Sequence, residues 1–113
     1  MAKTPESKVK DRVVALLNAV GAYHFFPATH GYGRSGVPDI VACINGHFLA
    51  IECKAGTNKP TALQVREIET IRANGGTAIV VNEQNLDMLH PLLAKLKRGT
   101  VIGGPDGPAS RTD

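Results

Sequence analysis

Residues 34–54 read RSGVPDIVACINGHFLAIECK, and this stretch decides the fold. Two apolar, strand-like runs flank Asn45-Gly46, a dipeptide that accepts the positive φ angles of a type I′ turn. A two-residue turn at this point fixes the register of an antiparallel hairpin, and in that register Asp39 faces Glu52. The stretch therefore predicts a β-hairpin that carries two carboxylates directly opposite each other.

The two faces of this hairpin differ in character, because side chains alternate along a strand. Lys54 lies two residues beyond Glu52 and therefore shares its face with Asp39. Facing carboxylates repel each other unless a shared proton, a nearby lysine or a divalent cation offsets the repulsion. A solvated face with Lys54 as counter-ion would explain any one of these residues, but the complete set favours a functional site. The opposite face is expected to be buried and comprises Ile40, Ala42, Ile44, Leu49, Ile51 and Cys53.

Length and composition indicate one globular domain of 113 residues with 42% hydrophobic residues. The net charge of +3 is compatible with a nucleic-acid partner without requiring one. Cys43 and Cys53 point to opposite faces of the predicted hairpin, so we expect free thiols rather than a disulfide. Their spacing does not fit a zinc site. No apolar run approaches the roughly 20 residues that cross a bilayer, and the N-terminus lacks a signal-peptide pattern.

A helix is predicted before the hairpin. Thr4-Pro5-Glu6 is typical of a helix start, and the helix should run to about Val20 and end at Gly21. Glu6 falls within the apolar stripe of this helix. It is therefore either a favourable charge near the helix dipole or an additional carboxylate that reaches the site. The stripe consists of Val9, Val13, Leu16, Leu17 and Val20.

A second helix is predicted from Thr61 to about Asn74. It starts with a capping box in which Gln64 returns to the cap, and a role of Gln64 in the site is the alternative. Residues 77–81 are β-branched and apolar, which predicts a buried strand parallel to the second hairpin strand, reached by a right-handed crossover. A last helical segment is expected within residues 85–97.

Residues 29–36, THGYGRSG, are predicted to form a glycine-rich loop between a short strand at 23–26 and the hairpin. A glycine-rich backbone can approach a phosphate closely, and Arg and Ser side chains supply donors. A plain connector is the alternative. Arg34 is the strongest candidate for a phosphate contact and His30 the weakest. The full candidate set is His30, Tyr32, Arg34, Ser35 and Gly36.

Asp39 and Glu52 would supply the hard oxygen ligands that Mg²⁺ prefers, with the main-chain carbonyl of Cys53 as a further ligand. Lys54 would orient or deprotonate an attacking water, or stabilise charge on a phosphate. A bound metal would activate that water and offset charge in the transition state. The chemistry that this set of residues indicates is phosphodiester hydrolysis.

Pro38-Asp39 followed by Glu52-Cys53-Lys54 resembles the PD-(D/E)XK nuclease superfamily, and residues 6 to about 81 resemble its virus-type replication–repair nuclease (VRR-NUC) domain. The resemblance implies a restriction-endonuclease-like α/β fold with the order αβββαβ and a small mixed sheet flanked by helices. It implies DNA cleavage that depends on Mg²⁺ or Mn²⁺. It also implies site roles for five residues: metal-site carboxylates at Glu6, Asp39 and Glu52, the catalytic lysine Lys54, and a supporting Gln64.

The same resemblance implies a homodimer that acts on branched DNA such as Holliday junctions. We expect residues 1–98 to form the nuclease domain and residues 99–113 a Gly/Pro-rich C-terminal tail. We expect a cytoplasmic or nucleoid-associated protein of a bacterial or phage-infected cell, neither secreted nor bound to a membrane. The main alternative is a non-catalytic DNA-binding module on the same fold. A metal-dependent phosphatase or other small-substrate hydrolase fits the composition less well.

Overall fold

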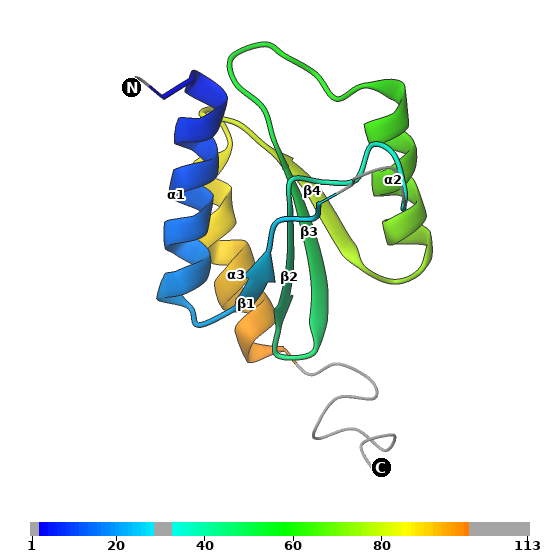
Figure 1. Cartoon of the computed structure of the whole chain (residues 1–113). Coiled ribbons are helices and arrows are strands. Elements are labelled where there is room, and N and C mark those ends of the chain that lie inside the picture. Colours follow the sequence, from blue (N-terminus) through cyan, green and yellow to red (C-terminus); the bar gives the residue numbers. More distant parts are fainter. Residues whose placement is uncertain (1–2, 29–32, 100–113) are drawn as a thin grey trace.

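Four strands form one mixed sheet in the computed structural model, which describes residues 3–28 and 33–99. They are β1 (Tyr23–Phe25), β2 (Ile40–Ile44), β3 (His47–Cys53) and β4 (Thr77–Val81), and they lie in this order across the sheet. The first three strands are antiparallel and β4 runs parallel to β3 (Figure 1). The predicted parallel pairing across a βαβ connection is thereby confirmed.

The hairpin of β2 and β3 has the predicted register. Asn45 and Gly46 both have positive φ angles, of 51° and 82°, as a type I′ turn requires. Ile40 pairs with Ile51 at the open end of the ladder. Asp39 directly precedes this pair, and one further step along the register brings it opposite Glu52.

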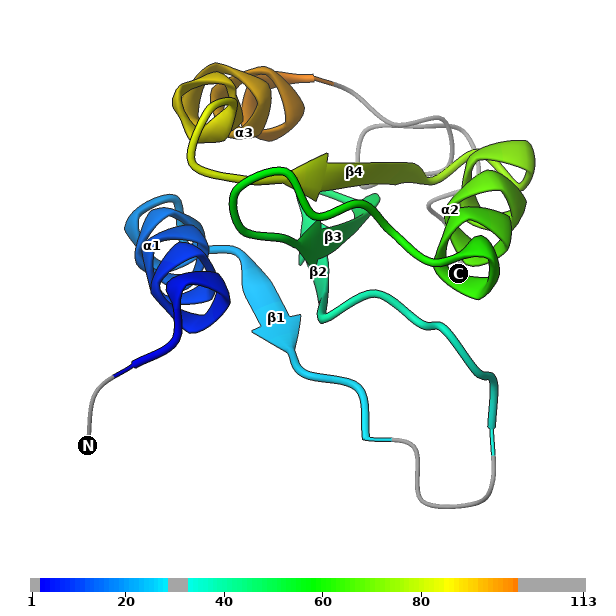
Figure 2. The same ribbon diagram turned by 90° about the horizontal axis from the view of Figure 1, so that it is seen from above.

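Helices cover both faces of the sheet (Figure 2). Helices α1 (Pro5–Ala19) and α3 (Leu89–Arg98) lie on one face, and α2 (Ala62–Ala73) lies on the other. A single 3₁₀ turn, η1 (Leu86–Met88), precedes α3. Pro91 lies in the first turn of α3, where its missing N–H removes no intrahelical hydrogen bond. None of the helices in residues 3–28 and 33–99 is long and apolar enough to span a bilayer.

The main core lies between the sheet and the pair α1 and α3. It buries the apolar face of the hairpin and three residues of the predicted α1 stripe, with Leu16 and Val20 partly buried beside them. A smaller cluster under α2 consists of Ala50, Ile68 and Ala78. The element order α, β, β, β, α, β, with α3 appended, is the restriction-endonuclease-like fold that the resemblance implies.

The chain segments that carry the candidate site meet at one end of the sheet. β3 ends there at Cys53, and helices α1 and α2 begin at the same end (Figure 1). Thr4 caps α1, since its side chain accepts the Ser7 N–H at 3.1 Å. Two of the candidate contacts, His30 and Tyr32, and residues 100–113 of the expected tail lie outside the described residues.

Candidate functional site

Glu52 is a charged side chain buried within the sheet, with 1% of its surface exposed. Its Oε2 atom accepts a hydrogen bond from Gln64 Nε2 at 3.0 Å and lies 3.5 Å from Lys54 Nζ. Its Oε1 atom is buried and has no hydrogen-bond partner among residues 3–28 and 33–99. A buried carboxylate oxygen without a partner is unfavourable. The site therefore has one oxygen open to a bound ligand.

Asp39 supplies the second carboxylate from the residue that precedes β2. Its Oδ2 atom accepts the Cys53 N–H at 2.9 Å, so the side chain adds one rung beyond the end of the β2–β3 ladder. Because Oδ2 is occupied in this way, Oδ1 is the oxygen left for another partner. The contact confirms that Asp39 lies beside the end of β3, as the register predicts.

The two carboxylates influence each other electrostatically. Burial, and then the negative charge of Asp39, raise the pKa of Glu52 to about 7, whereas Lys54 acts in the opposite direction. The charge of Glu6 makes a smaller contribution that also raises this pKa. A buried acid beside a like charge is destabilised in its ionised form. The repulsion that the sequence predicts is therefore present, and Lys54 opposes it.

Gln64 caps α2 as predicted and also contacts Glu52, while its role in the site stays a prediction. Its Oε1 atom accepts the Thr61 N–H at 2.8 Å, and its backbone N–H donates to Thr61 Oγ1, which completes the capping box of α2. Its Nε2 atom donates to Glu52. A carboxamide has separate acceptor and donor ends, so cap and site are not exclusive alternatives.

Glu6 lies in the first turn of α1 and is half-buried. Its charge raises the pKa values of both Glu52 and Cys53, so it faces the same end of the sheet. Within residues 3–28 and 33–99, however, no three His, Cys, Asp or Glu side chains form a cluster that could hold a metal ion. The structure brings Asp39 and Glu52 together without Glu6, whose role as a metal ligand stays a prediction.

The donor set at this end fits a hard divalent cation. Asp39 and Glu52 offer carboxylate oxygens, and the carbonyl of Cys53 belongs to the same end of β3. Mg²⁺ commonly takes only one or two protein carboxylates and keeps several waters. The unpartnered Oε1 of Glu52 is a ready position for such an ion.

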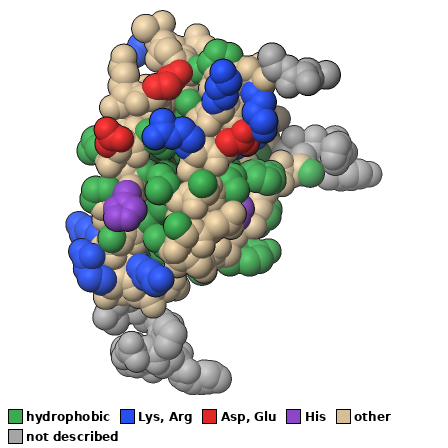
Figure 3. Space-filling model, turned by 90° about the vertical axis from the view of Figure 1, so that its left-hand side faces the viewer, with side chains coloured by type: hydrophobic (Ala, Val, Ile, Leu, Met, Phe, Trp, Pro, Cys, Tyr) green, Lys and Arg blue, Asp and Glu red, His purple; other side chains and the backbone are tan. Residues whose placement is uncertain are grey.

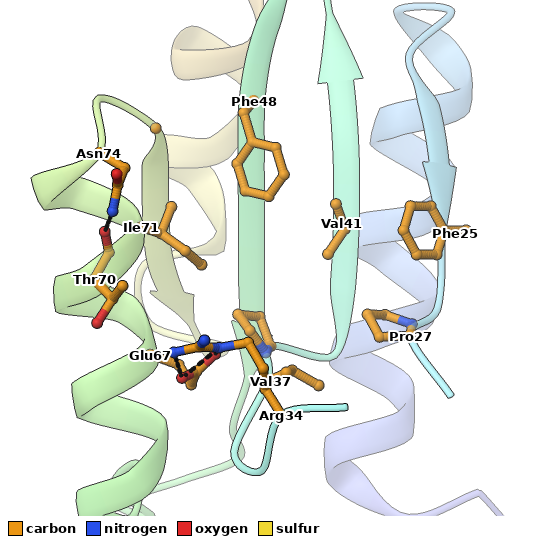
Figure 4. Close-up of a pocket in the computed structure, with 12 residues that line it drawn as sticks. Phe25, Pro27, Arg34, Val37, Val41, Phe48, Glu67, Thr70, Ile71 and Asn74 are labelled. Carbon is orange, nitrogen blue, oxygen red and sulfur yellow. Dashed lines mark hydrogen bonds and ion pairs between the residues drawn. The ribbon is translucent and has the colours of Figure 1, made fainter. Parts of the chain in front are cut away.

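Arg34 has a partner that the sequence did not indicate. Its Nε donates to Oε1 of Glu67 at 2.8 Å and its Nη2 donates to Oε2 at 2.8 Å, which makes a two-pronged ion pair with α2 (Figure 4). The hydrogen bond from Arg34 lowers the pKa of Glu67. The predicted phosphate contact competes with this pair. The sequence offered one indication that Glu67 faces the sheet: it lies between Gln64 and Ile71 at helical spacing, on the inner side of α2.

The two other described loop candidates, Gly36 and Ser35, lie in different environments. Gly36 has a φ of +74° and packs so closely on α2 that an added Cβ would lie 2.8 Å from the Leu63 carbonyl carbon. Its glycine is thus explained by this close approach and by the positive φ. Ser35 is exposed and stays a candidate DNA contact.

An apolar groove of about 600 Å³ lies next to the ion pair. Figure 4 shows it over β2 and β3, between β1 and α2, with Val41 and Phe48 on its floor and Phe25 on its β1 side. Phe25 and Phe48 are 45% and 46% exposed. The groove occupies the same face of the sheet as Glu52.

Figure 3 shows the face that carries α1 and α3. Lys and Arg side chains lie at both ends of this face, and acidic side chains lie among them at the upper end. The view shows no uniformly basic surface, in keeping with the small net charge of the chain.

Comparisons with known proteins agree on a family. Residues 10–102 match the family model "Archaeal holliday junction resolvase (hjc)". This range contains Asp39, Glu52, Lys54 and Gln64 but not Glu6. The chain is 37% identical over 89 residues to the "Putative nuclease p44" of Acyrthosiphon pisum secondary endosymbiont phage 1, an alignment that covers 76% of this chain and 91% of that protein.

Solved structures give the same answer for the fold. One, described as "VRR_NUC domain", superposes with a TM-score of 0.67 at 27% identity and covers 77% of this chain and 95% of its own. A second, "VRR_NUC domain protein", has a TM-score of 0.64 at 19% identity over 88% of this chain and 94% of its own, which supports the fold alone.

Proposed function

Because the chain belongs to the archaeal Holliday junction resolvase (Hjc) family and is a VRR-NUC nuclease of the PD-(D/E)XK superfamily, we propose that it is a Mg²⁺- or Mn²⁺-dependent DNA endonuclease. The observation that carries the metal dependence is the buried, unpartnered Oε1 of Glu52 beside a second carboxylate. A divalent cation there would remove the repulsion and satisfy the open oxygen at the same time.

Each side chain has a distinct role in the proposed hydrolysis of a phosphodiester bond. Asp39 and Glu52, with the carbonyl of Cys53, would hold the cation, and Glu6 would support them directly or through water. The bound cation would activate the attacking water and offset negative charge on the phosphate. Lys54 Nζ lies 3.5 Å from Glu52 Oε2. As an ammonium it would orient that water or donate to a phosphate oxygen, and as the neutral amine it would take a proton from the water. Gln64 fixes the rotamer of Glu52 through its hydrogen bond.

The substrate is proposed to be branched DNA such as a four-way junction, and the acting form a homodimer. The matched family model is one of junction resolvases, which supports this choice. A two-fold pair of sites suits paired nicks on opposite strands. Sedimentation of a dimer at working concentrations is expected. A monomer with junction cleavage first-order in monomer would contradict this part. A DNA substrate also favours the expected location in the cytoplasm or at the nucleoid.

The test of the activity uses labelled four-way junction and linear duplex, each with Mg²⁺, with Mn²⁺ and with EDTA. We expect cleavage of the junction with either metal, weaker cleavage of the duplex, and none in EDTA. Cleavage that persists in EDTA would contradict metal dependence, and equal cleavage of both DNAs would contradict selectivity. DNA binding without cleavage in either metal would instead favour a non-catalytic DNA-binding module.

A further inference from the structure

The segment that leads into Asp39 is fastened to helix α2 at two points. Arg34 grips Glu67 with two donors, and Gly36 rests on the backbone at Leu63. Pro38, which follows, is buried. The chain therefore leaves α2 only a few residues before it reaches the carboxylate of Asp39.

The same helix also holds the other carboxylate. Gln64 lies three residues before Glu67 on α2 and donates to Glu52. Residues three apart share one side of a helix. Both acids of the site are therefore held in position relative to α2. Glu52 is held through Gln64, and Asp39 is held through the segment that Arg34 and Gly36 fasten to the helix.

From these contacts we propose that Arg34 and Glu67 form a positioning clasp that sets the place of Asp39 relative to Glu52, rather than a contact to DNA. The inference rests on the proposed function, because the arrangement that it controls is that of the proposed metal site. Arg34 and Glu67 are positioning residues in this account, since neither touches the reacting atoms.

The charge and geometry of the pair favour positioning over phosphate binding. The Glu67 side chain is 10% exposed and the Arg34 side chain 66%. Glu67 neutralises the guanidinium that would otherwise attract a phosphate. A guanidinium that meets a carboxylate with two parallel donors fixes orientation as well as distance, which a lysine cannot do.

The site depends on this geometry because it has few ligands. Asp39 is held from one side by the Cys53 N–H, and a shift of the preceding segment would change the place of this carboxylate relative to Glu52. Because Asp39 and Glu52 are the carboxylates proposed to hold the cation, displacement of either one would weaken its binding. Partners that orient metal ligands typically change metal affinity or activity by about 10–100-fold when they are removed.

The experiment compares Arg34→Gln, Glu67→Gln and the charge reversal Arg34→Glu/Glu67→Arg with the wild type. Arg66→Gln removes a neighbouring exposed cation on α2 and is the matched control. Four quantities are measured: Mn²⁺ affinity by calorimetry, hydrogen exchange of the Cys53 amide, kcat and KM on the labelled junction, and the salt dependence of DNA binding.

We expect each single change to lower Mn²⁺ affinity and kcat by about 10–100-fold and to speed exchange of the Cys53 amide. KM and the salt slope should stay near those of the wild type. The charge reversal should recover a large part of the loss, and Arg66→Gln should leave metal affinity and amide exchange unchanged. If a Gln variant fails to fold, Arg34→Lys, which keeps the charge without the fork, takes its place in the comparison.

Two results would overturn the clasp. One is a raised KM for Arg34→Gln with a salt slope lowered by about one and normal Mn²⁺ affinity, as for a phosphate contact. The other is an unchanged Cys53 amide and unchanged Mn²⁺ affinity in Glu67→Gln. A wild type that neither binds Mn²⁺ nor cleaves DNA would refute the proposed function instead, while the Cys53 amide would still test the clasp.

Discussion

From Leu49 to Cys53 both faces of β3 are buried, but they are built from opposite chemistry. Toward α1 and α3, Leu49, Ile51 and Cys53 are all 0% exposed and pack in an apolar core. Toward α2, Ala50 is 0% and Glu52 is 1% exposed. One face gains stability by removing apolar surface from water. The other holds a carboxylate whose ionised form is disfavoured there, and we attribute this to function.

The largest expected effect is the loss of cleavage when a charged residue of the site is replaced and the apolar face is left intact. Asp39→Asn or Lys54→Ala should lower cleavage by about 10²–10⁴-fold, since each removes a group assigned to metal binding or proton transfer. DNA binding and the far-UV circular dichroism spectrum should be retained. Lys59→Ala, an exposed lysine in the next loop, is the control and should cleave normally. Loss of folding in the first two variants would point to a structural role.

The converse change is a substitution in the apolar face of β3. Ile51→Ala should lower the free energy of unfolding by about 2–5 kcal/mol, because it leaves a cavity in a fully buried core position. Denaturant titration measures this loss. At a temperature where the variant is folded, its kcat should remain close to that of the wild type. A stable variant that has lost cleavage would mean that the two faces are not separable.

The raised pKa of Glu52 should make the stability of the protein depend on pH. The folded value is about 7 against an ordinary value of 4.5, so the unfolded chain loses this proton first as pH rises. The free energy of unfolding should therefore fall between about pH 4.5 and pH 7, on the order of 1–3 kcal/mol from this group. Glu52→Gln should lack this part of the pH dependence. An identical slope in both proteins would contradict the assignment.

The smallest expected effect distinguishes the two contacts of the Gln64 carboxamide, the helix cap and the hydrogen bond to Glu52. Gln64→Glu keeps an acceptor for the Thr61 N–H but replaces the donor to Glu52 with a like charge, so cleavage should fall by about 10-fold and stability at neutral pH should also decrease. Thr61→Ala is the matched change, because it removes the cap acceptor and should lower stability by about 1 kcal/mol with cleavage retained. A reversed outcome would assign Gln64 to the helix alone.

Local signals in the sequence predicted the scaffold of this site. Asn45-Gly46 sets the hairpin register, and Thr61 with Gln64 sets the start of α2, since each acts over a few residues. The pairing of Asp39 with the end of β3 follows from that register.

Contacts between distant segments were not predictable in the same way. Arg34 and Glu67 are 33 residues apart, and no local pattern pairs them. The apolar groove likewise depends on where α2 stops covering the sheet, which leaves Phe25 and Phe48 half-exposed. The resemblance to a family supplied the carboxylate roles, but not the distance of Glu6 from the Asp39–Glu52 pair.

The most direct test of the central claim is anomalous diffraction from crystals soaked in Mn²⁺. We expect one strong anomalous peak between the carboxylates of Asp39 and Glu52, at about 2.0–2.2 Å from an oxygen of each, a range close to that of Mg²⁺. The peak should be absent from crystals of Asp39→Asn treated in the same way. No peak in the wild type, or one located away from Glu52, would contradict the claim that this buried pair is a metal site.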